Sequence, residues 1–174
     1  MKRASLLILA LAVVFAFNSC KKDENGNTII PSLSAMKAGA KWTSLARVTT
    51  VGDIPSVGKG IVIVATTNLS VTQGEYLAIT IRGTELKKYD LALTVTGTKT
   101  QCAFVFKNSA GDATSTYSAT KGSVTLTKYD AASKLISGTF EFTLVKIGAP
   151  TETIEFTGGT FSNISFIEGV LSGE

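Results

Sequence analysis

Apolar and polar residues alternate along most of the chain from residue 35 onward, with a period of two positions. Around residue 79, for example, Leu77, Ile79 and Ile81 alternate with Ala78 and Thr80. Side chains of an extended strand point to opposite faces in turn, so this pattern predicts strands with one face in a core and the other in solvent. The same alternation recurs at residues 91–96, 136–144 and 154–156.

Residues that favour turns separate these stretches at intervals of about eight to twelve positions. They lie at 52–55, 73–74, 108–112, 121–122 and 130–134. Connections this short join neighbouring antiparallel strands. The sequence therefore predicts an all-β domain built as a meander, either an antiparallel β-sandwich or, alternatively, a flattened up-and-down β-barrel.

Four segments depart from the simple alternation. Residues 61–64 are apolar at every position, which predicts a strand that is central or covered on both faces. Residues 114–120 carry polar side chains on both faces, which indicates an edge strand or an exposed hairpin. Gly158 and Gly159 predict a bulge or tight bend in the last hairpin. Residues 84–89 could form a single helical turn.

The first twenty residues are organised as an export signal. Lys2 and Arg3 precede an uncharged apolar run at residues 4–17, which Asn18 and Ser19 separate from Cys20. The run is shorter than the roughly 20 residues that a membrane-spanning helix needs. The arrangement resembles the signal peptide and lipobox of bacterial lipoproteins, which implies cleavage before Cys20 and a lipid on its sulfur.

We expect a signal peptide, a tether and one folded domain. The signal peptide is placed at residues 1–19, the flexible tether at 20–34, and a single antiparallel β domain at 35–174. Two or three acyl chains suffice for stable anchoring, so the membrane is an expected partner through the lipid.

The tether opens with a run of four charged residues, Lys21, Lys22, Asp23 and Glu24. The run resembles the charged tetrad that marks surface-exported lipoproteins of the Bacteroidetes. The resemblance implies a protein anchored in the outer membrane and displayed at the cell surface. A plain solvated tether, with the domain on the periplasmic face, is the alternative.

Charge and cysteine content narrow the chemistry further. The net charge of +4 falls to +2 when the leader with Lys2 and Arg3 is removed, and no basic run is longer than two residues. Nucleic acid is therefore not an expected partner. With Cys20 acylated, Cys102 has no disulfide partner, and it is expected in the core on the same strand face as Phe104.

Composition excludes most catalytic and metal sites. The chain contains no histidine, so Ser-His-Asp and Cys-His arrangements and most zinc sites cannot form within it. A carboxylate pair could still serve a glycosidase, from among Glu141, Glu152, Glu155, Glu168, Asp112 and Asp130. Glu141 and Glu155 fall on the polar sides of their strands, and Asn108 with Asp112 offers too few ligands for calcium. We expect no catalytic residues, no cofactor and no metal.

Four segments carry a family resemblance. They read MKAGAKW at residues 36–42, GSVTLTKYD at 122–130, ISGTFEF at 136–142 and IEFTGGTF at 154–161. These segments resemble a family of Bacteroidetes lipoproteins that carry a domain of unknown function of the DUF6252 kind. The resemblance implies an envelope lipoprotein with a sandwich or barrel-like β fold and no established activity.

Three hypotheses about function follow. The threonine-rich solvent faces suit a non-enzymatic envelope protein that binds a glycan or a protein partner at the outer surface, by residues that the sequence does not identify. Gly39 and Trp42 before a meander are similar to the start of calycin barrels such as lipocalins, which implies an alternative with a small apolar ligand inside. A carboxylate-based hydrolase is the further alternative. Trp42 is otherwise expected to plug the open end of a core.

Overall fold

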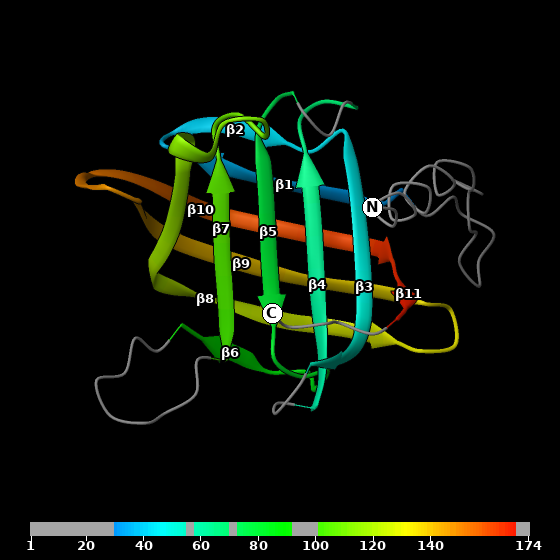
Figure 1. Cartoon of the computed structure of the whole chain (residues 1–174). Helices are drawn as coiled ribbons and strands as arrows, with labels where there is room; N and C mark the ends of the chain where they lie inside the picture. Colours follow the sequence, from blue (N-terminus) through cyan, green and yellow to red (C-terminus); the bar gives the residue numbers. More distant parts are fainter. Residues whose placement is uncertain (1–29, 55–57, 70–72, 92–100, 170–174) are drawn as a thin grey trace, which may run out of the picture. The chain divides into compact units, whose positions relative to one another are not determined.

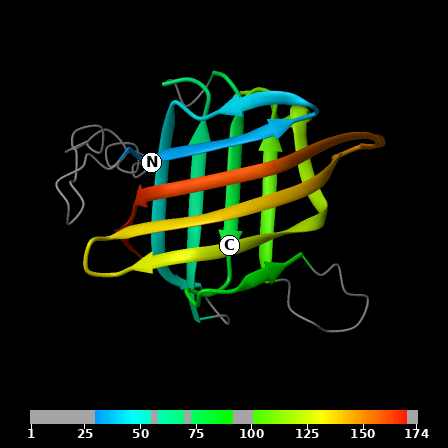
Figure 2. The same ribbon diagram turned by 180° about the vertical axis from the view of Figure 1, so that it is seen from behind.

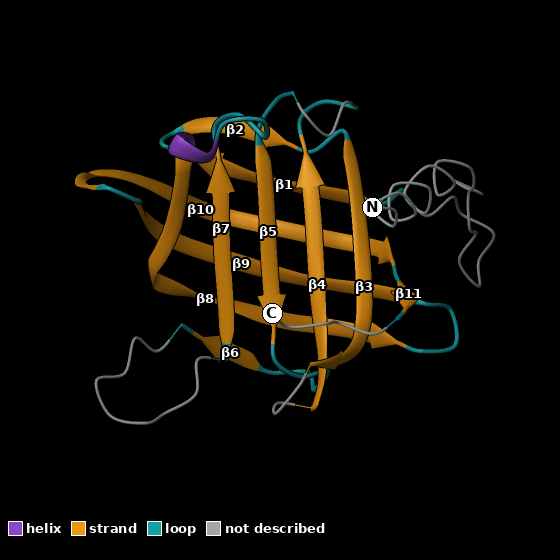
Figure 3. Ribbon diagram, in the orientation of Figure 1, coloured by secondary structure: helices purple, strands orange, loops and turns teal. Residues whose placement is uncertain are grey.

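Strands make up most of the described part of the computed structural model, which comprises residues 30–54, 58–69, 73–91 and 101–169 (Figure 3). The chain divides into two units, Met1–Ile30 and Pro31–Glu174, and every strand belongs to the second unit. The strands are β1 (Ser32–Lys37), β2 (Ala40–Thr43), β3 (Ala46–Ile54), β4 (Gly58–Thr66), β5 (Tyr76–Ile81), β6 (Lys88–Asp90), β7 (Cys102–Lys107), β8 (Thr116–Asp130), β9 (Leu135–Lys146), β10 (Ala149–Ser165) and β11 (Ile167–Glu168).

The strands pair into one continuous sheet in the order β11-β3-β4-β5-β7-β8-β9-β10-β1-β2, with β6 beside β8. Every pair is antiparallel except β11 with β3. The sheet is folded into two layers. Strands β3, β4, β5 and β7 form the first layer and run across β8, β9, β10, β1 and β2 of the second layer (Figures 1 and 2). The predicted all-β fold is confirmed, with the two layers of a sandwich made from a single curled sheet.

Strand β8 carries the sheet from one layer to the other. Its first residues pair with β7, and nearly its whole length pairs with β9. The register with β9 shifts between Ala119 and Lys121, and the adjacent Gly122 has a φ of 133°. A bulge bends a strand and increases its twist, which allows crossed layers to share a strand at a corner. The residues 121–122 are thus a bend inside a strand, and the predicted turn between strands is wrong.

Two consecutive amides close the opposite corner. The Ser44 N–H donates to the Leu33 carbonyl of β1 at 3.0 Å, and the Leu45 N–H donates to the Thr66 carbonyl of β4 at 2.9 Å. The chain therefore passes from β2 in the second layer to β3 in the first with both backbone donors satisfied. Further along, β10 ends in the second layer and β11 adds to the edge of β3.

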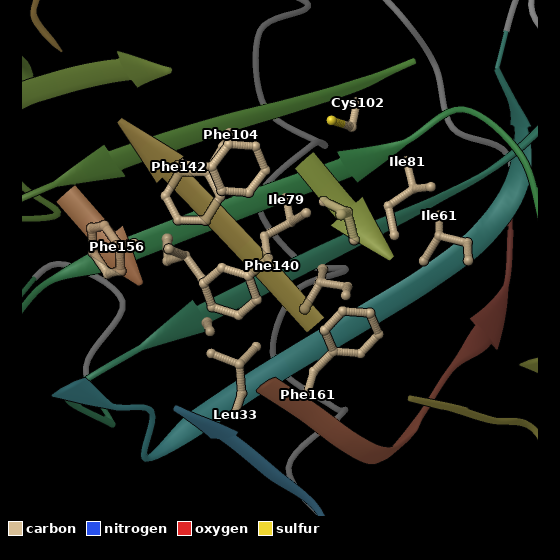
Figure 4. Packing of buried hydrophobic residues seen from close by; sticks show 14 of the residues in the cluster. Leu33, Ile61, Ile79, Ile81, Cys102, Phe104, Phe140, Phe142, Phe156 and Phe161 are labelled. Atoms are coloured by element: carbon tan, nitrogen blue, oxygen red, sulfur yellow. The ribbon is translucent and has the colours of Figure 1, made fainter. Parts of the chain in front are cut away.

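Phenylalanine rings from both layers fill the space between them (Figure 4). The ring centroid of Phe104 on β7 lies 4.3 Å from that of Phe142 on β9 and 5.3 Å from that of Phe156 on β10. Phe140 lies 5.7 Å from Phe104, and Phe106 lies 5.2 Å from Phe156. Burying one such side chain stabilises the fold by about 1.5–3 kcal/mol, and each ring pair adds about 0.5–1.5 kcal/mol. We call these five residues the aromatic cluster.

The first strand begins at Ser32, inside the segment 20–34 that was expected to be a tether. Leu33 is fully buried and pairs with Phe161 of β10, so this residue belongs to the core. In a flexible tether the Leu33 side chain would be exposed to solvent. The β domain therefore starts before residue 35.

No helix forms at residues 84–89, where Lys88 and Tyr89 belong to β6. Tyr89 is buried, and its hydroxyl donates to the Glu85 carbonyl at 2.9 Å across the bend at residues 85–87. A 3₁₀ turn, η1 (Ala113–Ser115), occurs instead ahead of β8, where Asp112 accepts a hydrogen bond from the Thr114 amide. The alternation at 92–96 lies outside the described residues.

The predicted edge strand at 114–120 is also wrong. Residues 116–118 pair with β7 on one side, and the strand pairs with β9 on the other. Tyr117 and Ala119 point into the core and are buried. The tyrosine ring is large enough to fill core space, so the face of the strand with Tyr117 and Ala119 is apolar despite the tyrosine hydroxyl.

We expect Gly122→Ala to lower the free energy of unfolding by about 3 kcal/mol or more, through backbone strain and overpacking together. A Cβ at this position would lie 2.1 Å from the Glu141 carbonyl oxygen, at a φ that favours glycine. Gly39, with a φ of 81° and open space around its missing side chain, is the matched control. Gly39→Ala should cost only about 1–2 kcal/mol. Urea unfolding of both variants checks this, and equal losses would contradict a tight corner at Gly122.

Candidate functional site

The outer face of the second layer carries a row of hydroxyl side chains across five strands. Thr139 of β9 pairs with Thr125 of β8 on one side and with Thr160 of β10 on the other. Ser34 of β1 continues the row from Thr160, and Thr43 of β2 continues it from Ser34. Neighbouring strands lie about 4.8 Å apart, so the hydroxyls repeat at about that spacing. We call these five residues the hydroxyl row.

A shallow pocket of about 290 Å³ opens on the same face. Three residues of the hydroxyl row, Thr125, Thr139 and Thr160, line it. The other residues that line it are Lys88, Ser123, Phe140, Glu141, Gly158 and Gly159. The pocket thus lies where β6, β8, β9 and β10 run side by side.

The bulge in β10 makes room for this pocket. The register of β10 with β9 shifts between Phe156 and Gly159, which confirms the predicted bulge. Gly158 has a φ of 57° and open space where a side chain would stand. No side chain therefore projects into the pocket at this position. A Cβ on Gly159 would lie 2.5 Å from the Phe140 ring. Glycine at that position therefore lets the ring pack directly against the backbone.

The pocket combines groups of complementary hydrogen-bonding capacity. Lys88 has an ammonium that only donates, Glu141 has a carboxylate that only accepts, and the threonine hydroxyls do both. The Lys88 ammonium lies 3.3 Å from Asp90, and both side chains are more than half exposed, so this ion pair is weak and can open. Such a set suits an uncharged ligand that is rich in hydroxyl groups.

Glu141 and Glu155 lie on neighbouring strands of this face. Glu155 pairs with Thr143, two residues along β9 from Glu141. Both carboxylates are exposed, and only Glu141 of the two lines the pocket. The two carboxylates of a glycosidase flank the sugar bond that is cleaved, whereas these two stand on an open sheet face. The pair therefore lacks the setting of a glycosidase site.

The other acids take part in local structure. Glu152 bonds the Lys146 ammonium at 2.9 Å, and Glu168 pairs with Lys134. Hydrogen bonds from the side chain and amide of Thr114 lower the pKa of Asp112, which caps η1. Bonds from Ser133 likewise lower the pKa of Asp130 in the turn between β8 and β9. Asp112 is thus already engaged by its own loop.

The family profile of a domain of unknown function, DUF6252, matches residues 30–165. The chain belongs to the DUF6252 family. No curated protein and no solved structure matches the chain. The matched span runs from just before β1 to the last residue of β10, so the DUF6252 domain covers every strand of the two-layered sheet except β11.

Some site predictions fall on parts of the chain without a described structure. Cys20 and the charged run Lys21, Lys22, Asp23 and Glu24 all lie outside the described residues. Within the described ranges, no three acidic or cysteine side chains gather closely enough to hold a metal ion. In those same ranges, no helix is long and apolar enough to cross a membrane.

The sequence alone did not identify the pocket residues. Alternation placed Thr139 and Glu141 on a polar face, and Gly158 on a bulge, but it could not say which residues of β8 and β10 lie opposite them. The register shifts twice between β8 and β9 and three times between β9 and β10, and alternation along a single strand does not reveal such shifts. The short segment with Lys88 gave no signal, because it was expected to be helical.

Cys102 occupies the core of the DUF6252 domain, as predicted. The side chain is fully buried, and its sulfur donates to the Tyr89 carbonyl at 3.2 Å. Burial raises the pKa of the thiol to about 11. The group therefore stays protonated at neutral pH and is a poor nucleophile.

This raised pKa predicts a loss of stability in alkali. The unfolded chain releases the thiol proton near pH 9, so between about pH 9 and 11 the unfolded state binds fewer protons and the free energy of unfolding falls. We expect Cys102→Ala to be less stable at neutral pH, through lost packing, but to lose less stability than the unmodified chain over that range. Urea unfolding at a series of pH values measures both. Parallel curves would show that the thiol titrates normally in the folded state.

Proposed function

We propose that this DUF6252 domain is a non-enzymatic module that binds a glycan on the outer face of its second layer. The hydroxyl row beside the pocket is the observation that carries the proposal. Each sugar hydroxyl needs partners that donate and accept, and a threonine hydroxyl provides both. Glu141 and Lys88 add charge-assisted bonds, which are about twice as strong as neutral ones.

The length of the row favours an oligosaccharide over a single sugar. Five hydroxyl positions on adjacent strands span about 19 Å, at about 4.8 Å per strand. The pocket at one end of the row can take one sugar unit, while the remaining hydroxyls bond the units that follow. The face lacks an exposed aromatic side chain in the pocket, since Phe140 is buried, so the expected affinity is modest.

Two alternative functions have less support. A barrel that carries an apolar ligand needs an internal cavity, whereas the aromatic cluster and Trp42 occupy the space between the layers. A carboxylate hydrolase needs two acids in a cleft, whereas Glu141 and Glu155 are exposed on an open face. The packing therefore favours a surface ligand over an enclosed one.

The proposed location is the outer membrane, with a lipid on Cys20 and display at the cell surface. The apolar leader, the position of Cys20 after Ser19, and the charged run from Lys21 to Glu24 support it. Residues 20–31 can span up to about 40 Å when extended, so the domain can reach a ligand beyond the membrane surface.

Glycan binding is tested with the chain that begins at Lys21. An array of envelope and extracellular polysaccharides, followed by calorimetry, should give binding that Thr139→Val weakens about 5- to 10-fold, the loss expected for one hydrogen bond. Thr151→Val, at an exposed position of β10 outside the pocket and the hydroxyl row, is the matched control and should leave the affinity unchanged. Equal weakening by Thr139→Val and Thr151→Val, or binding to envelope proteins and to no glycan, would contradict the proposal.

Anchoring is tested in the native host. Mass spectrometry of the purified protein should show acyl chains on Cys20, and Cys20→Ala should move the protein from the membrane to a soluble fraction. Protease treatment of intact cells should degrade the wild-type protein but spare a variant with alanine at Lys21, Lys22, Asp23 and Glu24. A Cys20 thiol without acyl chains would rule out the anchor. Full protection of the wild-type protein from the protease would rule out surface display.

A further inference from the structure

The outer face of the first layer is apolar. Its side chains lie in two adjacent rows across β3, β4, β5 and β7. One row holds Val48, Val64, Ala78 and Val105, and the other holds Thr50, Val62, Thr80 and Ala103. We call these eight residues the valine face, and none of them is charged. The face looks toward the viewer in Figure 1, where no described strand or turn lies in front of it.

Exposed hydrophobic residues occur close to these strands. Leu45 precedes β3 and Leu69 follows β4 in the chain, and their side chains are 66% and 69% exposed. Ile167 of β11 pairs with Thr50 at the edge of the sheet and is 52% exposed. Soluble proteins rarely leave a contiguous apolar patch of this kind uncovered unless it binds something.

The outer faces of the two layers differ in polarity. An antiparallel sheet with one face in a core ordinarily has a polar opposite face. The second layer follows this rule, with Thr139, Glu141 and Thr160 exposed. The first layer breaks it through four consecutive strands. The valine face is therefore expected to be buried against another surface.

We propose that the valine face packs against the valine face of a second copy of this chain. A symmetric dimer brings identical patches together, so a patch with charge at its centre repels itself and an uncharged one does not. Flat sheets with small β-branched side chains pack face to face at about 10 Å, as in the interior of a sandwich. The eight residues of the valine face are uncharged, and their side chains are small.

The size of the patch fits a weak dimer. A strand spacing of about 4.8 Å and a same-face repeat of about 6.8 Å give each outward side chain about 33 Å² of flat area. The valine face and the eight bordering side chains thus cover about 500 Å², before the relief of the side chains is counted. The bordering residues that reach the surface are Ala46, Tyr76, Arg82, Gln101, Lys107, Thr116, Ser118 and Ile167. The smallest specific interfaces bury roughly 600 Å² per partner, so the expected Kd is micromolar or weaker.

The dimer would place the two hydroxyl rows on opposite outer surfaces, because each lies on the layer that faces away from the valine face. Two sites on one particle raise the avidity for a repeating polymer without any new contact. This consequence rests on the proposed glycan binding, whereas the dimer itself does not.

The test is sedimentation velocity of the chain that begins at Lys21, from about 5 μM to about 1 mM. Omitting Cys20 removes disulfide-linked dimers. The unmodified chain should shift from one to two copies, and Val64→Lys should stay monomeric over the range, with Kd raised at least tenfold. Thr139→Lys places the same charge on the outer face of the second layer and should dimerise normally. A monomer at every concentration, assemblies that grow beyond two copies, or equal loss in both variants would overturn the proposal.

A second measurement uses the unmodified chain and does not depend on how Val64→Lys folds. Carbene footprinting at low and high protein concentration should show labelling of Val48 and Ile167 falling as the protein associates, while labelling of Thr139 stays constant. Dimerisation with protection confined to the hydroxyl row would place the interface on the other layer and overturn the assignment. Because glycan binding is measured separately, its failure would leave this result unaffected.

Discussion

The packing of phenylalanine rings between the two layers is the interaction on which the rest of this fold depends. Phe104 of β7 contacts Phe142 of β9 and Phe156 of β10, so one strand of the first layer is held against two of the second. A single sheet gains nothing by bending unless its bend buries a face. The sharp corners at Gly122 and at Ser44 restrict the backbone at an entropic cost of about 1–2 kcal/mol per residue, and burial of the rings offsets it.

Much of this fold could be predicted from the sequence, because one face of most strands is core. Leu77, Ile79 and Ile81 alternate with smaller or polar residues, and all three are fully buried. The errors arise where the local pattern does not determine the outcome. Lys121 and Gly122 have turn chemistry, but β9 pairs past them on both sides of a bulge, so they bend a strand. Tyr117 is polar by its hydroxyl and buried by its ring.

The candidate site could be predicted only in part, for a related reason. The sequence indicated that Thr139 faces solvent and that β10 bulges at Gly158, and both predictions are confirmed. The hydroxyl row, however, is a property of register, since a shift by one residue would replace Thr160 with a core phenylalanine. Register here is set by the core side chains of five strands together. No single segment of the sequence contains that information.

The strand that is apolar on both faces has a consequence for assembly. Val62 and Val64 point away from the core of a molecule that has only two layers, so no third layer within the described residues covers them. Replacing them with threonine would keep the strand propensity and give a polar outer face, as the second layer demonstrates at Thr139. The chain instead has valine there, beside Val48 of β3 and Ala78 of β5, and all of these side chains are small. Small side chains keep the face flat, and a flat uncharged face is complementary to itself. The two outer faces therefore differ in chemistry, and the two proposals follow that difference: a polar ligand for the face with hydrogen-bonding groups and a second copy for the apolar face.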